Sequence, residues 1–80
     1  PIEWQVRPGI LLHYITSEIV DVIDEGERLI LKTDQDRFYA EMSLSGYQCP
    51  ETIITQPADD KGHVRIHGNE GVIEVIKNQV

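Results

Sequence analysis

The residues of this sequence that could act as nucleophiles are three serines and one cysteine, namely Ser17, Ser43, Ser45 and Cys49. Nucleophilic catalysis requires such a group beside a base that a third group orients. No Gly-x-Ser-x-Gly turn surrounds any of the serines, and no basic residue flanks the cysteine to lower the pKa of its thiol. The sequence therefore predicts no catalytic residues, and we expect that the protein is not an enzyme.

Metal ligands are present but are poorly spaced. On a predicted strand, His63 and His67 project from the same face about 13 Å apart, too far for one ion, and His13 is remote in sequence. Asp34 and Asp36 lie in one turn, but the glycine and the further oxygen ligands of a calcium loop do not follow them. The six glycines form no phosphate-binding pattern. We therefore expect neither a metal ion nor a cofactor.

The charge balance argues against direct nucleic-acid binding. Seven basic side chains face 14 acidic ones, so the formal net charge is −7, whereas a polyanion requires a basic groove. Several of the aromatic residues that could stack on bases are expected in the core of so small a domain. These residues are Trp4, Tyr14, Phe38, Tyr39 and Tyr47. We also expect no membrane contact, because the longest apolar run, residues 10–12, is far shorter than a span of roughly 20 residues.

Short β-strands are the elements that must position these side chains. Of the 23 isoleucine, valine and leucine residues, 18 are branched at Cβ, which favours strands over helices. Turn residues interrupt the apolar segments about every 8–12 residues, a spacing typical of small barrels and sandwiches. The predicted strands are Ile2–Arg7, Ile10–Ile15, Glu18–Ile23, Arg28–Thr33, Arg37–Met42, Thr52–Thr55, His63–His67 and Val72–Lys77.

Two hairpins and one ambiguous segment follow from this pattern. The predicted hairpins join Glu18–Ile23 to Arg28–Thr33, and His63–His67 to Val72–Ile76 through the turn Gly68–Gly71. Alternation along these strands predicts that Leu29, Leu31, Val64 and Ile66 face inward. Residues 17–26 are also compatible with a short helix, because Ser17 could cap its N-terminus and Gly26 could end it.

Together these observations predict one all-β domain spanning residues 1–80. The expected architecture is a small SH3-like or OB-like barrel of about six to eight short strands. A β-sandwich is the alternative, and a short helix near residues 17–25 is left open. A single cysteine excludes an internal disulfide framework, and no signal peptide or apolar span is found, so we expect a cytoplasmic protein.

The acidic charge is concentrated in one stretch. Between Glu18 and Asp36 there are seven acidic and two basic residues, which give −5 of the total −7. A patch of this kind steers a basic protein partner towards it. In the loop Ser43–Glu51, Tyr47 is a second candidate contact, of the aromatic type enriched at interfaces. The candidate partner-binding residues are Glu18, Asp21, Asp24, Glu25, Glu27, Asp34, Asp36 and Tyr47.

We therefore expect a non-catalytic protein-interaction module or accessory subunit that uses the acidic surface of residues 18–36. The alternative is a structural building block of a homo-oligomer or virion-type assembly, in which neighbouring copies complete the small core. A small-ligand-binding domain is the third alternative.

Overall fold

The computed structural model describes residues 4–56 and 59–78, and these residues form nine β-strands and no helix. The strands are β1 (Trp4–Arg7), β2 (Ile10–Ile15), β3 (Ile19–Asp24), β4 (Arg28–Thr33), β5 (Phe38–Leu44), β6 (Tyr47–Gln48), β7 (Ile54–Gln56), β8 (His63–Gly68) and β9 (Val72–Lys77). The described part of the chain thus holds no helix with the length and apolarity needed to cross a membrane. The prediction of an all-β chain is confirmed.

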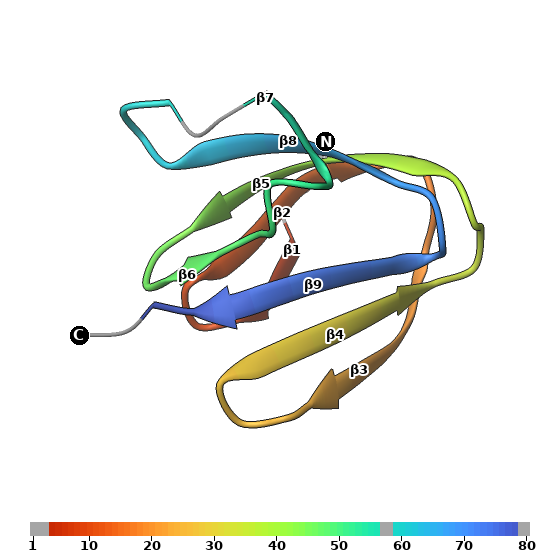
Figure 1. The fold of residues 1–80 in the computed structure, drawn as a ribbon, viewed down its shortest axis with the longest axis horizontal. Coiled ribbons are helices and arrows are strands. Elements are labelled where there is room, and N and C mark those ends of the chain that lie inside the picture. The colour runs from red at the N-terminus through yellow and green to blue at the C-terminus, as the bar shows by residue number, and fades with distance from the viewer. Residues whose placement is uncertain (1–3, 57–58, 79–80) are drawn as a thin grey trace.

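The strands form two antiparallel sheets (Figure 1). Sheet A has the strand order β1-β2-β5-β8-β7, and sheet B has the order β3-β4-β9-β6. Within the described residues, no ladder of hydrogen bonds joins the two sheets into a closed barrel. Each sheet therefore keeps two edge strands, which are β1 and β7 in sheet A and β3 and β6 in sheet B.

The segment that was compatible with a helix is a strand. β3 pairs with β4 from Ile19 opposite Thr33 to Asp24 opposite Leu29. The apolar residues of β3 are all branched at Cβ, and a branched side chain loses rotamer freedom in a helix but packs well on a sheet. Pairing with β4 therefore prevails over the helix-capping signals at Ser17 and Gly26.

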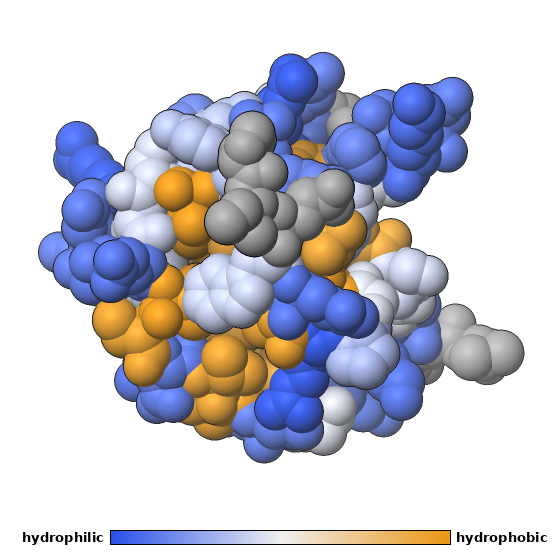
Figure 2. Space-filling view, turned by 180° about the vertical axis from the view of Figure 1, so that it is seen from behind, coloured by the Kyte–Doolittle hydropathy of each residue, from blue (hydrophilic) through white to orange (hydrophobic). Residues whose placement is uncertain are grey.

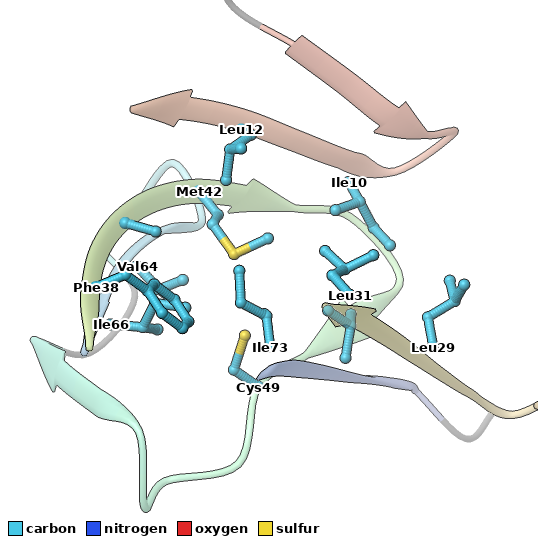
Figure 3. Packing of buried hydrophobic residues seen from close by; sticks show 12 residues of the cluster. Ile10, Leu12, Leu29, Leu31, Phe38, Met42, Cys49, Val64, Ile66 and Ile73 are labelled. Carbon is cyan, nitrogen blue, oxygen red and sulfur yellow. The ribbon is translucent and has the colours of Figure 1, made fainter. Parts of the chain in front are cut away.

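One hydrophobic core lies between the two sheets (Figure 3). As the alternation predicts, the four inward-facing residues of β4 and β8 are buried, namely Leu29, Leu31, Val64 and Ile66. Met42 from sheet A and Ile73 from sheet B are fully buried and belong to the same cluster. Burial of this set from both sheets is what holds them together.

Of the aromatic side chains, several of which were expected in the core, Phe38 lies in it and Tyr47 packs against it. Among the described residues, Phe38 is the only aromatic side chain in the buried cluster. Trp4 and Tyr14 are exposed, and Tyr39 and Tyr47 are half-buried. Branched aliphatic side chains supply most of the buried cluster, and the rings of Trp4 and Tyr14 lie at the surface.

The predicted hairpin between His63–His67 and Val72–Ile76 does not form. β8 pairs with β5 and β7 in sheet A, whereas β9 pairs with β4 and β6 in sheet B. The connection from β8 to β9 crosses between the sheets beside the connection from β4 to β5 (Figure 1). The Thr33 N–H donates to the Gly71 carbonyl oxygen (2.8 Å), and the Gly71 N–H donates to that of Asp36 (3.0 Å). The turn therefore bonds to the end of β4 and to the connection that follows it, which brings β9 beside β4 and not beside β8.

The boundaries differ from the prediction in the loop Ser43–Glu51. β5 continues to Leu44, and the loop contains the two-residue strand β6, which pairs with the end of β9. The following strand begins at Ile54 and not at Thr52.

Candidate functional site

The acidic hairpin, which we define as residues 18–36, consists of β3, β4 and the turns at their two ends. Its seven carboxylates all belong to exposed residues. Asp24, Glu25 and Glu27 lie at the β3–β4 turn, Glu18, Asp34 and Asp36 lie at the opposite end, and Asp21 lies on β3 between them. The structure thus keeps the predicted residues on one hairpin but divides most of them between its two ends.

Some of these carboxylates hold the hairpin in place. At one end, Asp34 Oδ1 accepts the backbone N–H of Glu18 (2.9 Å). At the other end, Asp24 Oδ1 accepts the Gly26 N–H (2.9 Å), and Asp24 Oδ2 lies 3.6 Å from Arg7 Nη1 on β1. These bonds favour the turn conformation at each end, and the ion pair joins the edge strands of the two sheets.

Glu25 is also engaged within the domain. Its Oε1 atom accepts bonds from Arg28 Nη2 (2.6 Å) and Nε (3.0 Å), and Arg28 Nη1 lies 3.3 Å from Glu74 Oε2 on β9. The hydrogen bond from Arg28 to Glu25, followed by the charges of both glutamates, raises the pKa of the guanidinium above its ordinary value. One of the two basic residues of the hairpin is therefore neutralised by carboxylates of its own domain.

Three carboxylates of the acidic hairpin remain available to a partner. In the part of the chain that the structure describes, the side chains of Glu18, Glu27 and Asp36 form no ion pair or hydrogen bond. Glu27 lies at the turn end and the other two lie at the opposite end. The charge that is free to attract a partner is therefore present at both ends of the hairpin.

β3 is an edge strand, since it pairs only with β4. A bulge between Ile19 and Asp21 interrupts its register and leaves Val20 without an opposite residue. Asp21 Oδ1 accepts the N–H of Val22 (2.8 Å). Bulges and charged side chains of this kind protect an exposed edge from uncontrolled strand pairing.

Tyr47 does not lie with the acidic residues, because β6 and β3 are opposite edges of sheet B. Its ring is half-buried and packs against the core. It lines a cavity of about 390 Å³ together with Leu44, Cys49 and Ile54. Burial raises the pKa of the Cys49 thiol to about 11, so this cysteine is held as an uncharged part of the cavity wall.

A cluster of rings that was not predicted from the sequence lies on the outer face of sheet A. His13 bonds through Nε2 to the Ser43 hydroxyl, and its ring centre lies 4.5 Å from that of His63. Farther along the same strands, the ring centre of Tyr39 lies 5.0 Å from that of His67 and 6.2 Å from that of Tyr14. The alternation of β5 and β8 could have revealed part of this face, but the place of His13 depends on the pairing of β2 with β5.

The chemistry of this face is limited. A cavity of about 260 Å³ includes His13, Glu41 and His63, but no three His, Cys, Asp or Glu residues in the described ranges are grouped as metal ligands. Ser43 has a base beside it, yet it lies on β5 between two paired strands. The ladders engage the neighbouring backbone donors, whereas an oxyanion hole requires free ones. Beside the cavity, backbone N–H bonds from His63 and Lys61 lower the pKa of Asp59.

Comparisons with protein-family models, with curated proteins and with solved structures find no match for this chain, so its function is argued from its own residues.

Proposed function

We propose that this protein is a non-catalytic interaction module or accessory subunit that binds a protein partner with a basic surface through the acidic hairpin. The observation that carries the proposal is that the seven carboxylates fall into two groups, one bonded within the domain and one left available. Several are bonded within the domain and fix the hairpin, whereas Glu18, Glu27 and Asp36 are exposed and have no side-chain partner among the residues that the structure describes. A hairpin whose turns are already fixed suits recognition, because little loop ordering is needed on binding.

The distribution of charge supports a basic partner. The acidic hairpin carries −5 of the total −7, so the attraction is directional and not uniform over the molecule. Its free carboxylates lie at the two ends of six-residue strands, roughly 20 Å apart at about 3.3 Å per residue. A basic surface that spans this distance can contact both ends, which fixes the orientation of the complex.

We also propose the finer features of the fold and the setting. The two sheets form a partly open barrel of the SH3-like or OB-like kind, which is supported by the direct passage of the chain from β5 to β6 and by the ion pair between β1 and β3. A cytoplasmic location suits the single, buried and unpaired cysteine. Direct nucleic-acid binding and membrane contact form no part of the proposal.

The test replaces only the free carboxylates. The triple variant Glu18→Lys, Glu27→Lys, Asp36→Lys changes the formal charge from −7 to −1 and leaves the internal bonds of the hairpin intact. Glu51, Asp60 and Glu70 are exposed and lie outside the hairpin, so their replacement by lysine is a control with the same change of charge. Both variants and the unaltered protein are used for affinity purification with quantitative mass spectrometry.

We expect the hairpin variant to lose a basic partner that the control variant retains. Three exposed ion pairs at about 0.5 kcal/mol each correspond to roughly a tenfold loss of affinity. Equal loss with both variants, or retention of every partner by the hairpin variant, would show that the acidic hairpin serves solubility only.

A further inference from the structure

Hydrophobic side chains are exposed on the edge strands β1 and β3. Seen from behind, they gather over the lower part of the molecule, at the height at which β3 lies in Figure 1 (Figure 2). Val20 on β3 is the most exposed large hydrophobic residue of the described ranges, at 61%, and Trp4 on β1 is exposed at 47%. On the same two strands, Val6 of β1 and Val22 of β3 are half-buried and pack against the core. The apolar side chains of each edge strand therefore continue into the interior of the domain.

The backbone of β3 is also open on the side away from β4. In an antiparallel pair, residues that exchange hydrogen bonds alternate with residues whose N–H and C=O groups point outward. At the turn, the Glu25 N–H donates to the carbonyl oxygen of Arg28 (2.8 Å). Glu25 is therefore a residue that bonds to β4. By the alternation of the register, the N–H and C=O groups of Asp24 and Val22 point to the open side. An added strand would find its hydrogen-bond partners there.

Asp21 covers one of the backbone donors of this open edge. Its carboxylate accepts the outward N–H of Val22 and so takes the place that a carbonyl group of an added strand would fill. Displacing it leaves an unbonded carboxylate at the new interface, which is costly unless a cation meets it. The Asp21 carboxylate therefore disfavours the addition of a neutral strand and favours that of a basic one.

From these observations we infer that β3 is the docking edge for an extended segment of a protein partner in which apolar residues alternate with lysine or arginine. The inference rests on the proposed function and gives the form that the basic partner takes. The segment adds to sheet B beside β3 and bonds to the outward groups of Val22 and Asp24. Its apolar side chains cover Val20, and its basic side chains meet the carboxylate of Asp21.

A second copy of this chain does not fit the same edge. Pairing β3 with β3 of another copy would bring together two hairpins that each carry −5. Like charges on directly opposed strands are destabilising, whereas a basic segment has the complementary charge. The occupant is therefore a different, basic chain.

The test uses a synthetic probe, a ten-residue peptide of alternating valine and lysine. Its control has the same sequence with alternate backbone nitrogens methylated, which preserves charge and side chains but removes hydrogen-bond donors. Binding of each peptide is measured by isothermal titration calorimetry. Val20→Lys disrupts the apolar contact, and Tyr14→Lys, on the outer face of sheet A, is the matched control variant.

We expect the unmethylated peptide to bind, and methylation or Val20→Lys to weaken binding at least tenfold while Tyr14→Lys leaves it within about threefold. Equal binding of both peptides would overturn strand docking. If the triple lysine variant of the acidic hairpin loses the peptide while methylation and Val20→Lys have no effect, the proposed function stands and this inference fails. A dimer of the unaltered protein in light scattering that Val20→Lys dissociates would also overturn it, because the occupant would then be a second copy.

The role of Asp21 in selecting a basic strand can be tested independently. In the unaltered protein, a peptide of alternating valine and glutamine should bind at least tenfold more weakly than the lysine peptide. In Asp21→Ala the Val22 N–H is uncovered, so this difference should shrink to threefold or less. An unchanged difference would show that Asp21 does not select the basic strand.

Discussion

At the scale of single residues, Cys49 shows how burial sets chemistry. The thiol is 6% exposed and lies in the core cluster between the sheets. Desolvation raises its pKa from the ordinary value of 9.0 to about 11, because a thiolate would lose its hydration without gaining a partner. This cysteine is therefore a small apolar filler and not a nucleophile.

The raised pKa predicts a loss of stability in alkali. Between pH 9 and 11 the unfolded chain releases the Cys49 proton while the folded protein keeps it, so unfolding becomes more favourable as pH rises. The contribution is at most about 1.4 kcal/mol per pH unit. The free energy of unfolding in urea, measured at pH 8 and pH 10, gives this contribution. The Cys49→Ala variant is the control, because it has no thiol to ionise. Identical pH dependence in both proteins would contradict the burial of the thiol.

The exposed charges of the site could be predicted from the sequence, but their individual roles could not. Alternation and turn composition indicate that residues 18–36 form a charged hairpin. Whether a carboxylate is free depends on contacts across the fold, as for Asp24 and Arg7 on β1. The ring cluster of His13 and His63 escaped prediction for the same reason, since it needs β2 and β8 to lie on either side of β5.

At the scale of elements, strand positions were predictable and strand partners were not. Period-two patterns locate β4 and β8 closely, because each has one buried face and one exposed face. The same patterns say nothing about which sheet a strand joins. The turn at residues 68–71 has the composition of a hairpin turn, yet its bonds to Thr33 and Asp36 direct β9 into sheet B.

The pairing of β5 with β8 depends on the absence of a side chain at Gly68. This residue lies opposite Phe38, and a Cβ atom there would be 2.0 Å from the aromatic ring. We expect Gly68→Ala to lower the free energy of unfolding by about 1–3 kcal/mol, because the ring must leave its place in the core. Urea unfolding measures the loss.

A double-mutant cycle isolates the cause. In a Phe38→Leu background the steric conflict is relieved, so Gly68→Ala should cost at least about 1 kcal/mol less than it does in the unaltered protein. An additive cost would mean that the ring does not pack over Gly68.

At the scale of the whole molecule, the two sheets depend on one core. Ile66 of sheet A and Ile73 of sheet B are both fully buried and belong to the same cluster. Two crossings, from β4 to β5 and from β8 to β9, bond to each other and connect the sheets covalently. The acidic hairpin is therefore not a separate arm, because β4 supplies Leu29 and Leu31 to this core.

This shared core predicts a single unfolding transition. Ile66→Ala and Ile73→Ala should each destabilise the protein by about 2–5 kcal/mol, because each leaves a cavity that both sheets line. Far-UV circular dichroism follows the strands of both sheets, and Trp4 fluorescence follows β1 of sheet A. With either variant the two signals should shift together in urea, since the buried residues of both sheets in the described ranges belong to one cluster. If Ile73→Ala shifted the dichroism and left the fluorescence midpoint unchanged, sheet B would unfold on its own, and the rigid support that the proposed binding edge receives from sheet A would be lost.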